Sequence, residues 1–343
     1  YMNFSTKIIH WYNQNYRDLP WRNTTDAYKI WLSEIILQQT RVSQGLPYYN
    51  NFIRAFPTVK DLANADEQQI LKLWQGLGYY SRARNLHFTA KFVLENYNGV
   101  FPNSYEELLK LKGIGTYTAA AIASFSSNEA VAVLDGNVFR VLSRVFNVEY
   151  DISQNSSKKY FTELATKVLS ETQPNIHNQA IMEFGALQCV PKSPNCIACI
   201  FNDSCEAFKL KKVSELPVKS KKVKVTKRFL NYILVKDVSE NYEMNKRTEN
   251  GIWKNLYEFP CVESEQEIGE SEILDVLKDS YSIKNFHYFE DFDVLHKLSH
   301  QHLNIKFYTI EIKESINNGY TFEEMKQLPV PIVLHNFIEK IVI

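Results

Sequence analysis

The sequence predicts a mainly α-helical region over residues 1–210, followed by an α+β domain over residues 229–343. Apolar residues recur at helical spacing, without continuous β alternation, through residues 30–42, 68–74, 138–145 and 158–169. Later segments are instead rich in β-branched and aromatic residues, which favours strands over 229–235 and 305–312. A chain of 343 residues also exceeds one ordinary core, so more than one domain is expected.

Several element boundaries can be assigned from capping residues. Ser104, with Glu107 three positions later, predicts a capping-box start for a helix that ends at Gly113. Asp135 precedes the apolar stripe of the next helix and is placed to cap it. In the second domain, helices are expected near residues 271–280 and 334–341.

Charge is distributed unevenly along a chain whose net charge is zero. The balance is +2 over residues 1–210, +7 over residues 211–228 and −9 over residues 229–343. A neutral total argues against bulk phosphate binding, so any nucleic-acid contact must be local. The charged, proline-interrupted segment 211–228 is interpreted as a linker, either a solvated tether or a strap that faces DNA.

Composition excludes several protein classes. With 45% apolar residues and only 11 Gly and 11 Pro, the sequence is neither collagen-like nor disordered. No apolar run approaches the ~18 residues of a membrane span. No basic-then-apolar leader opens the chain, so a cytoplasmic protein is expected.

Four of the five cysteines cluster in a short segment. Cys189, Cys196, Cys199 and Cys205 are separated by six, two and five residues, so one loop can surround one metal centre. Four thiolates suit structural zinc or a [4Fe–4S] cluster, and spacing alone favours neither. With four ligands no coordination position stays open, which indicates a structural or redox role.

Two further features carry possible chemistry. Residues 111–122 read as a helix end, a Gly-x-Gly turn and a new helix, whose free N–H groups can bind a DNA phosphate. Glu34 has Ile30, Leu37 and Gln38 beside it at helical spacing, and a carboxyl among apolar neighbours has a raised pKa. Taken singly, a plain helix turn and a solvated glutamate are the commoner readings.

Together, the Gly-x-Gly hairpin, Asp135 and the cysteine loop resemble the helix-hairpin-helix base-excision DNA glycosylases with an iron–sulfur cluster, over about residues 5–210. The segments Ser33–Thr40 (SEIILQQT) and Leu19–Arg22 (LPWR) look closely like the signatures of MutY-type adenine DNA glycosylases. The resemblance implies a [4Fe–4S] cluster on the four cysteines. It also implies a six-helix and hairpin subdomain over about 22–130, and a cluster subdomain from the N-terminal segment plus about 131–210.

The resemblance also assigns site residues. Asp135 would stabilise the positive charge that develops at C1′ of an extruded nucleotide, and Glu34 would protonate the adenine. Asn137 would support Asp135 and the catalytic water. Tyr117 stands where bifunctional relatives carry a Schiff-base lysine, so base removal without efficient strand cleavage is implied.

Substrate contacts follow in the same way. The adenine pocket would be lined by Trp21, Arg22, Leu37, Gln179 and Met182, with Glu183 on the same helix. Residues Gln39 and Tyr79 would wedge into the duplex, and Thr40 closes the motif that carries Gln39. Contacts to the DNA backbone would come from Gly113, Gly115, Thr116, Thr118 and Ser124.

The segment Gly251–Pro260 (GIWKNLYEFP) looks like the Nudix-like domain that reads 8-oxoguanine in this family. An R-E-x-x-E-E metal motif is absent from the sequence, so binding rather than hydrolysis of nucleotides is implied. The family's Phe-Ser-His reading loop corresponds here to Leu298, Ser299 and His300, where leucine replaces the aromatic residue.

The implied protein is a monomeric hydrolase of base excision repair, associated with the nucleoid. It removes adenine mispaired with 8-oxoguanine or guanine in double-stranded DNA by base flipping. Two alternatives stay open: a thymine or uracil mismatch glycosylase of the same superfamily, and a non-catalytic lesion-binding iron–sulfur protein.

Overall fold

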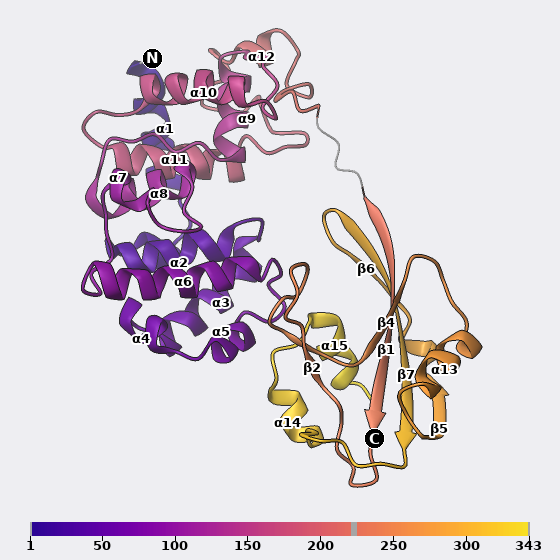
Figure 1. The fold of residues 1–343 in the computed structure, drawn as a ribbon. Helices are drawn as coiled ribbons and strands as arrows, with labels where there is room; N and C mark the ends of the chain where they lie inside the picture. The colour runs from indigo at the N-terminus through magenta and orange to yellow at the C-terminus, as the bar shows by residue number, and fades with distance from the viewer. Residues whose placement is uncertain (1, 221–224, 342–343) are drawn as a thin grey trace. The chain divides into compact units, whose positions relative to one another are not determined.

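The computed structural model describes residues 2–220 and 225–341, which form two compact units (Figure 1). The helical unit contains the described residues up to Asn64 and from Asn85 to the linker. The C-terminal unit contains Ala65–Arg84 and the described residues after the linker. The grouping of Ala65–Arg84 with the C-terminal domain is not indicated by the sequence pattern.

The helical unit is built from α-helices of four to sixteen residues and the three-residue 3₁₀ helix η1. Their bounds are α1 Met2–Asn15, η1 Pro20–Arg22, α2 Ala27–Leu37, α3 Val42–Ala55, α4 Val59–Asn64, α6 Ser81–Asn96 (which begins in the other unit), α7 Tyr105–Leu108, α8 Thr116–Ser127, α9 Gly136–Val145, α10 Asn155–Val168, α11 Pro174–Leu187 and α12 Glu206–Lys209. Among the described residues, none of these helices has the length and apolar character needed to cross a bilayer.

One apolar core joins the first helix to helices far along the chain. Ile8 of α1, Val141 of α9, Phe161 of α10 and Phe184 of α11 are fully or almost fully buried in it. Burial of such side chains stabilises a fold by about 2 kcal/mol each. The core therefore fixes the start of α9, and with it Asp135, against α11.

Two local expectations require correction. The stripe over 30–42 is interrupted, since α2 ends at Leu37 and Gln39 has a φ of 57°. Ser104 does cap α7, accepting from Glu107 N at 3.4 Å. The carboxylate of Glu107 accepts from Tyr97 and Lys110 instead of closing a capping box, and the helix ends at Leu108, before the expected Gly113.

The first part of the expected linker is folded. Leu216 is buried in the helical core, and its carbonyl accepts a hydrogen bond from Arg144 Nε at 3.0 Å. Ile152 N donates to Val218 O at 3.0 Å. Leu216 and Val218 are therefore held against the helical unit, while residues 221–224 lie outside the described part of the chain.

The C-terminal unit is a mixed sheet with a helix on each face. Its described elements are α5 Glu67–Leu73, β1 Thr226–Lys236, β2 Asn245–Lys246, β3 Tyr257–Glu258, β4 Cys261–Ser264, α13 Glu270–Lys278, β5 Ile283–Tyr288, η2 Glu290–Phe292, β6 Val294–Lys297, β7 Gln301–Ile312, α14 Phe322–Gln327 and α15 Ile332–Ile338. Strands β1 and β7 are parallel and central, and β4, β5 and β6 pair with them antiparallel. The strands expected over 229–235 and 305–312 are confirmed.

Alternation along β7 decides which helix covers which face of the sheet. Ile310 packs with Ile273 and Leu277 of α13, whereas Phe307 stacks on Phe337 of α15 with ring centroids 4.1 Å apart. Residues 307 and 310 point to opposite faces because successive strand residues alternate. The hairpin between β6 and β7 carries Leu298, Ser299 and His300, and Leu298 N donates to Gln301 O at 2.8 Å.

Candidate active site

A cavity of about 460 Å³ in the helical unit gathers the residues that the sequence singled out. This volume lies within the range of small-molecule pockets and exceeds the size of one purine base. The predicted residues that line it are Trp21, Arg22, Glu34, Leu37, Thr40, Tyr117, Asp135, Asn137, Gln179, Met182 and Glu183.

Glu34 lies on the buried side of α2 and is only 8% exposed. Burial raises the pKa of its carboxyl to about 7; the negative charge of Asp135 adds to that rise, while Tyr117 and Arg22 oppose it. The hydroxyl of Tyr117, on α8, donates to Glu34 Oε2 at 2.7 Å. The carboxyl is thus poised to hold or release a proton near neutral pH.

Removal of the Tyr117 hydroxyl is expected to raise the pKa of Glu34 above its value of about 7. In Tyr117→Phe the ionised carboxylate loses a hydrogen bond, and the protonated form persists to higher pH. Infrared or carbon-13 NMR titration of the Glu34 carboxyl measures this shift. The same change at the half-exposed Tyr160 serves as a control and should leave the titration unmoved. A shift toward acid pH in Tyr117→Phe would contradict the assignment.

Asp135 caps a helix and also lines the cavity. Its Oδ1 accepts from Val138 N at 2.7 Å, which caps α9, and its Oδ2 accepts from Asn137 Nδ2 at 2.8 Å. Burial raises the pKa of Asp135, and these two hydrogen bonds oppose the rise by stabilising the anion. The carboxylate is therefore held in one orientation at the wall of the cavity that also contains Glu34.

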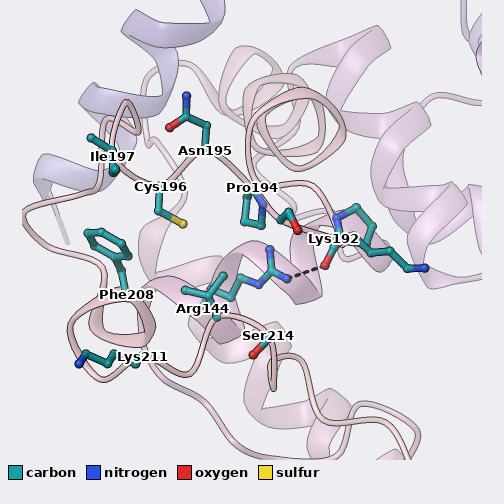
Figure 2. Close-up of a pocket in the computed structure, with 12 residues that line it drawn as sticks. Arg144, Lys192, Pro194, Asn195, Cys196, Ile197, Phe208, Lys211 and Ser214 are labelled. Atoms are coloured by element: carbon teal, nitrogen blue, oxygen red, sulfur yellow. Dashed lines mark hydrogen bonds between the residues drawn. The ribbon is translucent and has the colours of Figure 1, made fainter.

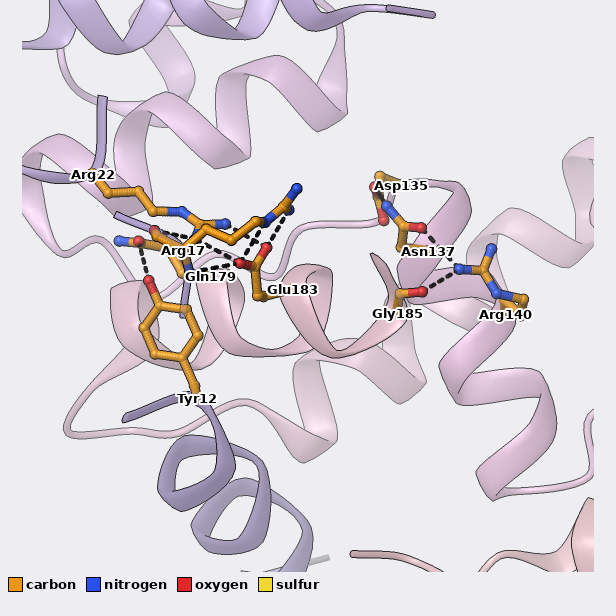
Figure 3. Close-up of polar contacts among 9 residues, drawn as sticks. All are labelled: Tyr12, Arg17, Arg22, Asp135, Asn137, Arg140, Gln179, Glu183 and Gly185. Carbon is orange, nitrogen blue, oxygen red and sulfur yellow. Dashed lines mark hydrogen bonds and ion pairs between the residues drawn. The ribbon is translucent and has the colours of Figure 1, made fainter. Parts of the chain in front are cut away.

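A buried carboxylate on α11 is held by two arginines (Figure 3). Glu183 is 1% exposed and accepts from Arg22 Nη2 at 2.7 Å and from Arg17 Nε at 2.8 Å. Burial opposes its ionisation, but the arginines outweigh burial and hold the pKa of Glu183 at about 2. Arg17 lines the same cavity and was missed, although a second arginine five residues before Arg22 is a visible signal.

Glu183→Gln is expected to destabilise the helical unit by about 3 kcal/mol, because it leaves two partly buried arginines without their anion. The free energy of unfolding in urea at pH 7 measures the loss. The depressed pKa gives a second readout. In the wild type this contribution is present above pH 4.5 and is lost as the pH falls toward about 2. Between pH 7 and pH 3 the free energy of unfolding should therefore fall more in the wild type than in Glu183→Gln. An equal acid response of both proteins would contradict this account.

Gln179 presents one end of its amide to the cavity. Its Oε1 accepts from the hydroxyl of Tyr12 at 2.8 Å, and the guanidinium of Arg22 lies over the Tyr12 ring at 5.7 Å (Figure 3). Because the carbonyl oxygen is engaged, the amide nitrogen is the group placed to donate to an acceptor in the cavity.

Arg140 joins the Asp135 region to the cysteine segment, and Figure 3 shows its contacts with Asn137 and Gly185. It donates to Asn137 Oδ1 at 2.9 Å, to Gly185 O at 2.5 Å and to Cys189 O at 2.7 Å. A Cβ built on Gly185 would lie 2.6 Å from Asn137 Cβ, so α9 and α11 approach closely there. Arg140 was missed because an arginine in a helix ordinarily reads as a solvated residue.

The four cysteines line a second cavity in the same unit. Arg144 is 2% exposed, and its Nη1 lies 3.5 Å from Cys189 Sγ and donates to Val190 O at 2.8 Å. Phe201 N donates to Cys199 Sγ at 3.4 Å. In an adjoining pocket the side chain of Cys196 points toward Arg144 (Figure 2).

The chemistry of this donor set fits an iron–sulfur cluster. Four cysteine side chains from one segment line one cavity, and the irons of such a cluster are held by four cysteine thiolates. N–H groups directed at sulfur are also typical partners of cluster thiolates.

The expected DNA-backbone residues divide into two groups. Gly113, with a φ of 81°, and Gly115 and Thr116 are exposed at the hairpin. Ser124 is fully buried and its hydroxyl accepts from Asn178 Nδ2 at 2.8 Å. Thr118 is buried as well, and accepts from Gln38 Nε2 at 3.4 Å. The side chains of Ser124 and Thr118 are thus engaged within the protein, and the phosphate contacts expected near them stay a prediction.

The remaining predicted contacts are exposed, except for the half-buried Leu298. Gln39 lies in the turn after α2. Tyr79 is 43% exposed and its hydroxyl is hydrogen-bonded to that of Ser299, within the C-terminal unit. Leu298 and His300 flank Ser299 in the hairpin between β6 and β7.

Comparisons with known proteins identify similar domains in both parts of the chain. Residues 32–168 match the HhH-GPD superfamily of base excision DNA repair proteins, and residues 231–340 match the NUDIX domain. An adenine DNA glycosylase of Buchnera aphidicola is 38% identical over 308 residues, which is 88% of this chain and 84% of that protein.

Two solved structures share the fold of the helical part. A thermostable thymine-DNA glycosylase has a TM-score of 0.57 and 29% identity, and the match covers 60% of this chain and 95% of that one. An endonuclease III in complex with DNA has a TM-score of 0.53 and 18% identity, covering 61% and 95%.

Proposed function

The chain belongs to the adenine DNA glycosylases of the MutY type, hydrolases of base excision repair, and from this premise we propose its substrate and mechanism. The substrate is adenine mispaired with 8-oxoguanine in double-stranded DNA, and A:G mispairs are poorer substrates. The observation that carries the mechanism is one cavity lined by both Glu34, whose pKa is raised to about 7, and Asp135.

Glu34 acts as the general acid. The flipped adenine enters the cavity, where Glu34 protonates N7 and makes the purine a better leaving group. Tyr117 holds the acid in place through its hydrogen bond to Oε2. Gln179 donates to the base edge through its amide nitrogen, since its oxygen is engaged by Tyr12.

Asp135 stabilises the sugar as the glycosidic bond breaks. The departing base leaves positive charge at C1′, and a fixed carboxylate beside that charge lowers the barrier. Asn137 keeps the carboxylate oriented and supports the attacking water. No lysine is among the described residues that line the cavity, so base removal proceeds without a Schiff base.

Lesion reading is assigned to Leu298, Ser299 and His300 in the C-terminal unit. Ser299 and His300 supply hydrogen-bonding groups, while Leu298 offers no aromatic ring for stacking. Because residues 229–343 carry a charge of −9, phosphate contacts come from the +7 segment 211–228 and the hairpin at Gly113–Thr116. The protein acts as a monomer on nucleoid DNA.

The four cysteines would hold a [4Fe–4S] cluster. When bound, the cluster ties four points of the segment 189–205 together and supplies a one-electron redox centre. Elemental analysis of the purified protein tests this assignment. We expect iron and acid-labile sulfide at about four each per chain, lost together in Cys199→Ser. Zinc without sulfide would refute it.

Single-turnover base release across a panel of duplexes tests the function. We expect fast release of adenine opposite 8-oxoguanine, slower release opposite guanine, and abasic product without strand cleavage. Release of thymine or uracil from T:G or U:G duplexes would instead support the mismatch-glycosylase alternative. Tight lesion binding with no base release would support the non-catalytic alternative.

A further inference from the structure

Residues 65–84 contain α5, the turn 76–80 that carries Tyr79, and the first residues of α6. In the sequence they lie between two segments of the helical unit, but in the structure they group with the C-terminal domain. Specific polar contacts account for this grouping.

Lys72 of α5 binds the carboxyl end of α14. Its Nζ donates to Lys326 O at 2.6 Å and to Leu328 O at 3.1 Å. A cation placed there satisfies carbonyls that have no partner within the helix. Val330 N donates to Gln75 Oε1 at 3.3 Å, one turn along from Lys72. Lys72 is half-buried, and burial lowers its pKa.

A second set of contacts holds α5 and the start of α6 against the loop before β3. Asn255 Nδ2 donates to Glu67 Oε1 at 2.6 Å, and Arg84 Nη1 donates to Lys254 O at 2.9 Å. Asn255 adopts a φ of 66°, a conformation that asparagine and aspartate tolerate better than most residues. The two contact sets lie on different parts of the C-terminal domain, so together they restrict rotation of the segment.

The turn that carries Tyr79 is braced from within the segment. Arg82 Nη2 donates to Gly78 O at 3.2 Å, and its guanidinium lies over the rings of Trp74 and Tyr79 at 5.1 and 5.6 Å. Trp74 Nε1 also donates to Gly78 O, at 2.9 Å. At the outer end, the Tyr79 hydroxyl meets that of Ser299.

We propose that Lys72 and Asn255 are positioning residues that determine mispair specificity, by fixing the Tyr79 turn beside the Ser299 hairpin as one recognition surface. The proposal rests on the function proposed above. Neither residue lines the cavity that contains Glu34 or belongs to the hairpin that carries Ser299. They keep the Tyr79 turn and the Ser299 hairpin from moving apart. A lesion can then contact both without first having to order them.

Specificity, and not the chemical step, is the quantity that should change. An A:G mispair offers Ser299 no oxidised guanine to read, so its processing depends little on this surface. An 8-oxoguanine mispair uses the preset geometry, and loosening the segment lowers that advantage. The ratio of single-turnover rates for A:8-oxoguanine and A:G, at subsaturating enzyme, reports the effect.

The experiment compares two independent breaks with a rescue. Lys72→Met removes the cation and keeps the chain length. Asn255→Asp sets a carboxylate against that of Glu67. Each is expected to lower the ratio about tenfold, the factor typical of losing one charge-assisted hydrogen bond, with the A:G rate unchanged. Adding Glu67→Gln to Asn255→Asp restores a donor–acceptor pair and should restore the ratio.

Matched controls separate this result from general damage. Lys91→Met removes an exposed lysine of α6, and Glu67→Gln alone retains an acceptor for Asn255. Both should keep the wild-type ratio. An unchanged ratio in Lys72→Met and Asn255→Asp would overturn the proposal, as would an equal fall of both rates. A wild-type protein without preference for A:8-oxoguanine would instead refute the proposed function.

Discussion

Replacement of Asp135 with asparagine is expected to slow single-turnover adenine release about 10³-fold, the size typical of losing a preorganised charge at a reacting centre. The amide oxygen still accepts from Val138 N, so α9 keeps its cap and the protein should remain folded. What the variant lacks is the negative charge that offsets the developing positive charge at C1′. Rapid-quench measurement on an A:8-oxoguanine duplex, with enzyme in excess, isolates this step.

The matched control is Asp26→Asn, which makes the same change at the N-cap of α2, where the carboxylate accepts from Tyr28 N at 3.0 Å. Asp26 does not line the cavity. Its variant should release adenine at nearly the wild-type rate. Equal rates for Asp135→Asn and the wild type would show that the carboxylate takes no part in bond cleavage.

Glu34→Gln is expected to slow base release about 10²- to 10⁴-fold, the range for loss of a general acid. Glutamine keeps the shape and can still accept from the Tyr117 hydroxyl, but it has no acidic proton. The wild-type rate should fall as the pH rises through about 7, because Glu34 is an acid only while protonated. The rate of the variant should show no such fall. If the variant's rate still fell at alkaline pH, the fall would be assigned to another titrating group.

Glu34→Gln, which is expected to lower the rate of base release, is expected to raise the stability of the folded protein at alkaline pH. Burial raises the folded-state pKa of Glu34 above its unfolded value, so its favourable contribution is complete below pH 4.5 and is lost as the pH rises through about 7. At pH 8 the wild type carries a buried carboxylate that glutamine replaces with a neutral group. Glu34→Gln should therefore melt at a higher temperature than the wild type at pH 8. A lower melting temperature would contradict the pKa assignment.

Sequence motifs selected many residues that line one cavity, because these residues lie on regular helices. Glu34 and Leu37 are one turn apart on α2, so helical spacing places both on the cavity side. Asp135 and Asn137 lie at one helix start, where capping rules already expect a carboxylate. For such residues, local rules and the motif indicate the same position.

The groups that the sequence did not reveal depend on distant partners. Arg17 meets Glu183 across 166 positions, and Arg140 reaches Cys189 across 49. Leu216 is buried although it lies in a segment whose composition indicates a solvated linker. Ser124 is buried because residues on every face of α8 are buried. Small residues permit such packing, but they do not by themselves predict it. Tertiary packing, and not local pattern, decides each of these cases.

The close approach of α9 and α11 limits which residues are tolerated at position 185. With only 2.6 Å between Asn137 Cβ and a Cβ at position 185, even alanine would displace the amide that orients Asp135. Position 185 touches no substrate in the proposed mechanism, yet every substitution there is transmitted to the reacting centre. Inherited variation at this glycine should therefore behave as loss of catalysis, although its location would suggest a harmless structural change.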